Sequence, residues 1–328
     1  MSERDLLTRH RGRATWGERL VPLGDFRDAA RRAGIELPEG AREAARAGFV
    51  APRVGGEGTP VEGPFERVVV CGGVYNNRFA LDSLLEEAAA FDAEAIYCLG
   101  DLGGFGPSPE AVRPVIERGG VRVVQGNYED SLASGREDCN CGYADPRDNH
   151  FADLSYRYTE SNCSAAFKEW LGSHPKERRV RVGTRELLLA HGSPRRINEF
   201  LFESTTPDAY LEVLCRQRAC DGILVTHTGL HWHRPLPSGR DVVNVGVLGR
   251  PANDGRREVW YARLSAVERE GAPALEVDRR QLAYDWQALA AEMRRERLPE
   301  EFVETIETGW WTTCLEVLPA KERARSRY

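Results

Sequence analysis

Residues 67–127 decide the fold: they open with RVVVCGG (67–73), continue with EAIYCLGD (94–101) and close with VRVVQGN (121–127). Each of these runs is short, apolar and rich in β-branched residues, which predicts three strands. The segments between them, ALDSLLEEAAAF (80–91) and SPEAVRPVIERGG (108–120), have helical spacing. The stretch therefore predicts a strand–helix–strand–helix–strand unit.

The pattern continues outward from this unit. A helix is expected at AAFKEWLG (165–172), two strands around a Gly-Thr turn at 178–193, and further strands at GILVTHTG (222–229) and RDVVNVGVLG (240–249). Strands that alternate with helices predict an α/β protein, with a layered mixed β-sheet sandwich flanked by helices. Functional residues are expected at the ends of the strands.

Composition narrows the class of protein. The chain has 328 residues, of which 29% are charged and 41% hydrophobic, and this is ordinary for a soluble globular protein. The net charge of −6 provides no basic surface for nucleic acid, and the absence of a long apolar run or signal sequence predicts a cytoplasmic protein without a membrane partner. Composition leaves open whether the protein forms a homo-oligomer. The eight cysteines are expected to be buried hydrophobes or metal ligands rather than disulfides.

Three parts are predicted along the chain. Residues 1–63 are expected to form a helical N-terminal extension that ends in a Gly- and Pro-rich linker, and residues 64–275 the catalytic domain. Residues 276–328 are expected to form a helical C-terminal extension, which packs on the catalytic domain through Trp310 and Trp311. Within the catalytic domain, Ser108 is expected to cap the helix that starts at Pro109.

Four polar residues each follow an apolar strand: Asp101, Asn127, His191 and His227. Strand ends gather at one edge of a sheet, so these side chains are predicted to converge. One carboxylate, one amide oxygen and two imidazoles suit Fe, Zn or Mn. The sequence therefore predicts one well-formed site for a divalent transition metal.

Five segments resemble, in order, the motifs of the calcineurin-like metallophosphoesterases, in particular their bacterial branch of small phosphodiesterases and phosphatases. They cover residues 67–264 and are GDLGGFGPSPEAV (100–112), QGNYED (125–130), LAHGSP (189–194), VTHTG (225–229) and VNVGVLGRPANDG (243–255). This resemblance implies the fold of that superfamily. It also implies a site for two metals that share Asp101, in which the second metal takes Asn127, His191 and His227.

The ligands that belong only to the first metal of the family are missing. The family's opening Asp-x-His falls on Gly72 or Gly73 and on Val74 or Tyr75, and Gly229 replaces the second His of Gly-His-Thr-His. This selective loss favours a mononuclear or remodelled centre over a decayed one.

Several residues are candidates for the remodelled part. Cys71, Cys139, Cys141 and either His231 or His233 are candidate metal ligands, since thiolates would favour Zn or Fe. Each also has a structural explanation as a packing, loop or surface residue.

Two further residues are candidates for catalysis. Tyr128 occupies the position of the family's catalytic His and is a poorer acid near neutral pH, because the ordinary pKa of tyrosine is about 10. Arg78 is a candidate for contacting a phosphate in place of the missing metal. A surface arginine at a helix start is the structural alternative.

The resemblance implies a metal-dependent hydrolase of a small phosphorylated substrate, in which the metal activates a water for attack on phosphorus. One alternative is a lyase or redox enzyme with a thiolate-modified Fe or Zn centre. The other is a non-catalytic metal-binding protein of the same fold.

Overall fold

The computed structural model describes residues 15–16, 19–20, 59–269 and 271–323. The chain divides into two compact units, Met1–Val54 and Gly55–Tyr328, which are described separately. In the first unit, β1 (Thr15–Trp16) and β2 (Arg19–Leu20) pair antiparallel. The other residues of the predicted N-terminal helical extension up to residue 58 lie outside the described residues.

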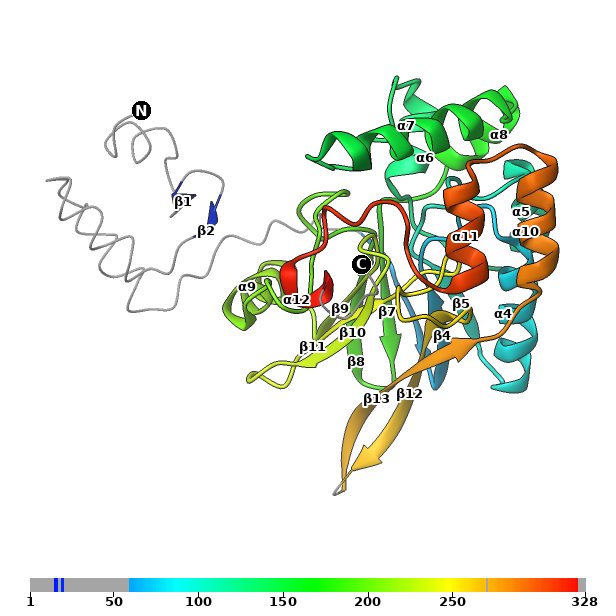
Figure 1. Ribbon diagram of the computed structural model, residues 1–328. Helices are drawn as coiled ribbons and strands as arrows, with labels where there is room; N and C mark the ends of the chain where they lie inside the picture. The colour runs from blue at the N-terminus through cyan, green and yellow to red at the C-terminus, as the bar shows by residue number, and fades with distance from the viewer. Residues whose placement is uncertain (1–14, 17–18, 21–58, 270, 324–328) are drawn as a thin grey trace, which may run out of the picture. The chain divides into compact units, whose positions relative to one another are not determined.

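Two sheets build the second unit (Figure 1). In spatial order, the described strands of the five-stranded sheet are β13 (Ala272–Leu282), β12 (Val259–Arg269), β4 (Arg67–Cys71), β5 (Ala95–Cys98) and β6 (Arg122–Val123). Those of the six-stranded sheet are β10 (His231–Pro235), β11 (Asp241–Val245), β9 (Gly222–Val225), β8 (Arg185–Ala190), β7 (Glu177–Val182) and β3 (Val61–Phe65). β3 thus begins three residues before the predicted start of the catalytic domain at 64. The domain boundaries stay predictions.

Both sheets mix parallel and antiparallel pairs. β4, β5 and β6 are parallel to one another, whereas β12 is antiparallel to β4. In the other sheet β8, β9 and β11 are parallel, and β7 and β10 join antiparallel. The strand ends of the predicted unit at 67–127 therefore meet at one edge, as expected for parallel strands.

Apolar side chains fill the space between the sheets. Val68 and Val70 of β4 contact the same buried cluster as Leu187 and Leu189 of β8. Because side chains of a strand alternate between its faces, Val69 and Cys71 point to the opposite side of the five-stranded sheet. The result is the predicted sandwich of two sheets with helices outside.

Helices cover the outer faces. The five-stranded sheet packs against α4 (Arg78–Ala90), α5 (Val112–Arg118) and α8 (Ala165–Gly172). The six-stranded sheet packs against α9 (Asp208–Arg218). The sequence analysis assigned no helix at α9, nor at α6 (Asn127–Ser134) and α7 (Pro146–Ser161).

The C-terminal part contains α10 (Trp286–Arg295), α11 (Glu300–Thr308) and α12 (Ala320–Arg323). Phe302 and Ile306 of α11 pack with Phe105 and Phe151, and Trp311 packs in a separate buried cluster. Of the two tryptophans named from the sequence, Trp311 therefore packs against residues of the rest of the unit such as Phe202. Within the described part of the chain, none of the helices combines the length and apolar character that a membrane span needs.

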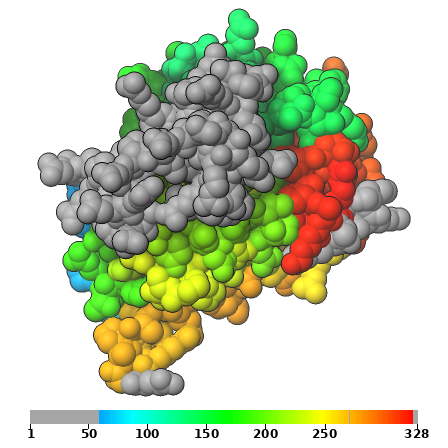
Figure 2. Space-filling model, turned by 90° about the vertical axis from the view of Figure 1, so that its left-hand side faces the viewer, coloured from blue at the N-terminus to red at the C-terminus, as the bar shows by residue number. Residues whose placement is uncertain are grey.

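One local prediction differs from the structure, and one feature was not predicted. Ser108 makes no capping hydrogen bond, because its backbone is left-handed (φ 49°) and its hydroxyl lies within hydrogen-bond distance of Glu292 of α10 and of Glu296, the residue that follows α10. Beyond the predicted strands, β12 and β13 form a long hairpin whose far end stands clear of the other elements of its unit (Figures 1 and 2).

Candidate metal centre

The four predicted ligands converge where the two sheets meet. His191 Nε2 lies 3.2 Å from Asp101 Oδ2, 3.0 Å from Asn127 Oδ1 and 3.0 Å from His227 Nδ1. All four side chains are buried. Asp101 follows β5, Asn127 starts α6 after β6, and the two histidines follow β8 and β9. The convergence therefore depends on both sheets.

Hydrogen bonds fix which atom each ligand presents. Asn127 Nδ2 donates to the Cys139 carbonyl (2.8 Å), so its Oδ1 faces His191. His191 Nδ1 lies 2.7 Å from the Leu99 carbonyl, which makes Nδ1–H the donor and leaves the lone pair of Nε2 directed at the cluster. Asp101 Oδ1 accepts from the Tyr128 backbone N–H (3.1 Å), and Oδ2 is left for the cluster.

These donors fit a metal ion. A carboxylate, an amide oxygen and two imidazoles present lone pairs to one another, an arrangement that a shared cation stabilises. Asp101, His191 and His227 each offer a ligand atom within 4.8 Å of the others. Two ligands about 2.1 Å from a common ion and at a right angle to each other are about 3.0 Å apart, which agrees with the separations around His191 Nε2.

A proton competes with a cation for this position. Burial opposes charge on His191, but the Asp101 carboxylate outweighs burial and raises the pKa of His191. Burial and the neighbouring His191 lower the pKa of His227 to about 3, so His227 stays neutral and its lone pair is available. His227 Nε2 has no hydrogen-bond partner among the described residues. The cluster is therefore electrostatically prepared for a positive charge.

Glu129 holds the two ligand-bearing loops together and was not singled out from the sequence. Its carboxylate accepts hydrogen bonds from the backbone N–H groups of Asp101 (2.8 Å), Leu102 (2.7 Å) and Gly126 (2.6 Å). Burial, followed by the Asp101 charge, raises the pKa of Glu129 to about 7. Its place two residues after Asn127, within a motif-like segment, was the available signal.

The backbone at two ligands is left-handed. Asp101 has φ 56° and His227 has φ 69°, a region that non-glycine residues adopt rarely and mostly at functional sites. A Cβ at Gly100 would lie 2.3 Å from the backbone nitrogen of Gly126. Glycine at 100 thus allows the loops carrying Asp101 and Asn127 to approach each other.

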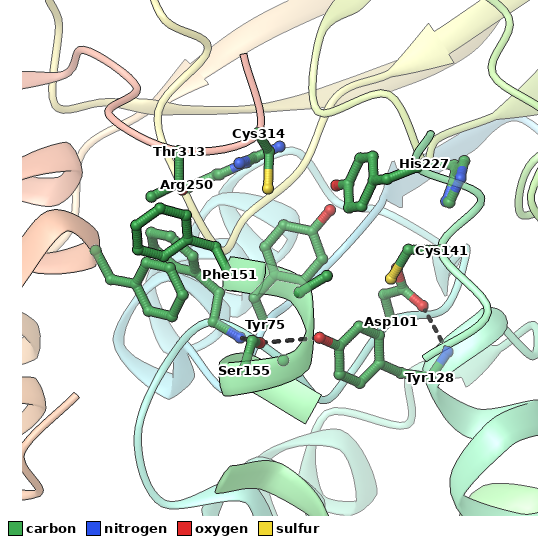
Figure 3. A pocket seen from close by; sticks show the side chains of 15 residues that line it. Tyr75, Asp101, Tyr128, Cys141, Phe151, Ser155, His227, Arg250, Thr313 and Cys314 are labelled. Atoms are coloured by element: carbon green, nitrogen blue, oxygen red, sulfur yellow. Dashed lines mark hydrogen bonds between the residues drawn. The ribbon is translucent and has the colours of Figure 1, made fainter. Parts of the chain in front are cut away.

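A cavity of about 50 Å³ opens beside the cluster, enough for a few water-sized groups (Figure 3). Asp101 and His227 line it together with residues of α7, α11 and the segment after α11. The other residues that line this pocket are Tyr75, Gly104, Phe105, Tyr128, Cys141, Tyr143, Phe151, Ala152, Ser155, Arg250, Phe302, Thr313 and Cys314.

Tyr128 lines this pocket, as a residue predicted for catalysis should. Its hydroxyl lies 2.9 Å from Ser155 Oγ, so it is directed at α7 (Figure 3). Burial raises the pKa of Tyr128 further above its ordinary value. Tyr128 is therefore a weaker acid here than a tyrosine in water.

Arg78 lies away from the pocket. Its guanidinium forms an ion pair with Glu292 of α10 (2.9 Å) and sits 4.2 Å from the centroid of the Phe79 ring. The predicted contact with a phosphate does not fit this position, because Arg78 already ties α4 to α10.

Cys139 and Cys141 form a disulfide. This differs from the expectation of thiolate ligands, since a disulfide sulfur carries no thiolate charge. Cys141 still lines the pocket, and Asn127 donates to the Cys139 carbonyl. The pair therefore shapes the loop beside the ligands.

The remaining candidate ligands lie elsewhere. Cys71 is buried in the core beneath the helices, where β4 pairs it with Cys98. His231 stacks on Trp260 with 3.5 Å between ring centroids, and His233 Nε2 lies 2.9 Å from Asp241 Oδ1. Both histidines belong to β10, which begins after the turn at Gly229. Neither is part of the group of ligand atoms formed by Asp101, His191 and His227.

Arg250 is a pocket residue to which the sequence analysis gave no role. It lies in the segment VNVGVLGRPANDG, which was matched only as a whole. Its burial depends on Trp311, about sixty residues away, so no local pattern marks it.

Comparison with known families agrees with this geometry. Residues 67–267 match the model of the calcineurin-like phosphoesterase superfamily domain. The chain belongs to this superfamily.

Two solved structures share the superfamily fold. One is a hypothetical protein from Pyrococcus horikoshii, with 23% identity, a TM-score of 0.62 and coverage of 75% of this chain and 99% of that chain. The other is a metallophosphoesterase from Sphaerobacter thermophilus, with 22% identity, a TM-score of 0.54 and coverage of 74% and 99%. None of the curated proteins matches this chain in sequence.

Proposed function

We propose that the protein is a metal-dependent hydrolase of a small phosphorylated substrate. The observation that supports this most strongly is the convergence of Asp101, Asn127, His191 and His227 at the wall of a pocket. Membership in the calcineurin-like phosphoesterase superfamily also supports the proposal, because it suggests activity on phosphoesters.

The donor set indicates the class of metal. Nitrogen and oxygen donors without a thiolate suit Mn, Fe or Zn. When bound, such an ion supplies Lewis acidity and lowers the pKa of a coordinated water. Asp101, Asn127, His191 and His227 would hold the ion. The carbonyls of Leu99 and Cys139 orient His191 and Asn127 for this role.

The described residues that line the pocket offer only weak proton donors for the leaving group. Tyr128 is the nearest candidate, and burial raises its pKa. General-acid catalysis works best when the pKa of the acid is near the working pH. We therefore expect substrates whose leaving group needs little protonation, such as aryl phosphates or phosphoanhydrides.

A non-catalytic metal-binding protein remains the alternative candidate. It is favoured by the absence of the ligands that the family's first metal uses: the Asp position falls on Gly72 or Gly73, the first His position on Val74 or Tyr75, and the second His position on Gly229. Turnover distinguishes the two functions.

Elemental analysis and an assay on the full-length protein test the proposal. Protein purified without added metal, and then titrated with Mn²⁺, should bind one ion per chain and hydrolyse p-nitrophenyl phosphate. His191→Ala should lose both properties, whereas His150→Ala, at an exposed position on α7, should keep them. Metal binding without turnover of any phosphoester would favour the non-catalytic alternative, and absence of metal binding would reject the site.

A further inference from the structure

Arg250 is a buried cation without an anionic partner. Its side chain is 6% exposed, and no carboxylate among the described residues forms an ion pair with it. Its buried Nε forms no hydrogen bond. A buried charge is costly unless it is paired, so an unpaired guanidinium in a pocket indicates that an anion belongs beside it.

Aromatic contacts hold Arg250 in place, and a side-chain hydrogen bond with Cys314 uses one of its donors while Nε stays unbonded. The guanidinium carbon lies 3.6 Å from the centroid of the Trp311 ring and 6.0 Å from that of Phe105. Trp311 is itself fixed, because its indole N–H donates to the Pro251 carbonyl (2.6 Å). Stacking of this kind leaves the donors at the edge of the guanidinium free to bind a ligand.

Gly229 provides the space that this arrangement needs. A Cβ at Gly229 would lie 2.7 Å from the Trp311 ring and 3.1 Å from Arg250 Nη2. Any side chain at 229 would therefore displace Trp311 or Arg250. Gly229, two residues after the ligand His227, replaces a histidine of the family and thus makes room for the Arg250 guanidinium.

The groups around Arg250 do not neutralise it. Desolvation raises the pKa of Tyr75 and of Tyr143, and burial raises the pKa of the Cys314 thiol despite the nearby Arg250. All three are therefore uncharged near neutral pH, and the positive charge stays available to the pocket. In Figure 3, Arg250 lies toward one end of this pocket and Asp101 and His227 toward the other.

We propose that Arg250 is the oxyanion-binding residue of this pocket and takes the phosphoryl group of a compact phosphomonoester. A guanidinium matches two phosphate oxygens in a bidentate contact. The small cavity and its aromatic lining, with Phe105, Phe151 and Phe302, favour a substrate with a compact, planar or apolar remainder. The choice of phosphate over other oxyanions rests on the proposed function.

Calorimetric titration with inorganic phosphate tests the proposal on the full-length protein, both as purified and after treatment with a chelator. Arg250→Met should weaken phosphate binding by about tenfold or more, the loss expected for a charge-assisted contact, and Arg250→Lys should lose less. The matched control is Arg257→Met, because Arg257 also stacks on a tryptophan, Trp286, at 4.5 Å but does not line the pocket. Equal phosphate affinity in wild type and a folded Arg250→Met would overturn the proposal.

Crystals of the wild-type protein soaked in tungstate, a phosphate analogue, provide the second measurement if Arg250→Met does not fold. An anomalous peak in contact with the Arg250 guanidinium supports the proposal, and tungstate bound only elsewhere overturns it. Arg250-dependent phosphate binding without turnover would reject the hydrolase and keep the anion site. Turnover together with phosphate binding that is unchanged in Arg250→Met would keep the hydrolase and reject the anion site.

Discussion

The pocket has two sides, and each needs a bound ion of the opposite charge to the other. On the ligand side, Asp101, Asn127, His191 and His227 direct lone pairs at a common point. On the arginine side, which comprises Gly229, Arg250 and Trp311, a permanent cation stands without an anionic partner. The ligand side calls for a cation, whereas the arginine side already contains one and calls for an anion.

The difference shows how a shared fold accommodates a changed site. The ligand side depends on hydrogen bonds that the ligands donate to backbone carbonyls, such as that from His191 Nδ1–H to the Leu99 carbonyl. The arginine side depends on Trp311, which lies beyond the residues matched by the superfamily domain. A segment outside the family domain therefore completes the pocket.

The largest expected effect is on the ligand side. His191→Ala should lose the metal and reduce phosphoester hydrolysis by more than the roughly 10–100-fold that loss of a supporting group costs. Metal content and kcat/KM are the measurements. A folded variant with normal metal content and activity would show that the ligand side is not a metal site.

On the arginine side, Gly229→Ala should destabilise the protein by about 1–3 kcal/mol more than Gly239→Ala. Both glycines have a similar positive φ, 75° and 79°, but a Cβ at 239 meets nothing within 4 Å. The difference in the free energy of unfolding, measured by urea denaturation, therefore isolates the clash with Trp311 from backbone strain. Equal destabilisation would mean that Trp311 does not occupy this position.

A smaller effect outside both sides is expected at His174. Burial, followed by the charge of Arg178, lowers its pKa to about 4, below the ordinary value of 6.5. Between these values the unfolded chain binds more protons than the folded one, so stability falls as pH falls from about 6.5 to 4. Comparing urea midpoints across this range, His174→Gln should show a shallower decline, and an identical decline would contradict the assignment.

The smallest expected effect concerns the disulfide-bonded loop next to the metal ligands. The double variant Cys139→Ser, Cys141→Ser should keep its metal, because Asn127 donates to the Cys139 backbone carbonyl, which serine retains. The measurement is the metal stoichiometry of the double variant, and of the wild-type protein before and after treatment with a reducing agent. Loss of the metal would restore the thiolate-ligand hypothesis.

The sequence predicted the ligand side because each ligand directly follows an apolar strand, where parallel topology fixes its position. It did not predict Arg250 as a pocket residue, because the contact with Trp311 joins segments about sixty residues apart. Ser108 illustrates the same limit on a local scale. The residues Ser-Pro-Glu fit a helix start, but tertiary hydrogen bonds to Glu292 and Glu296 hold Ser108 in another conformation.

The hairpin and α7 were missed for a different reason. β12 and β13 place many charged residues on exposed faces, so their apolar alternation is weak, as at Arg269 and Arg279. In α7, polar residues such as Asp148 and Ser155 are buried because they bond to the backbone of Val317 and Phe105. Burial of polar groups through remote partners has no signature in local periodicity.

The most direct test of the central claim is a crystal structure of the purified protein with data collected at the absorption edge of its metal. We expect one anomalous peak, bonded to Asp101, Asn127, His191 and His227, and none beside Arg250. A second metal on the arginine side, or a metal bound away from these four residues, would contradict it.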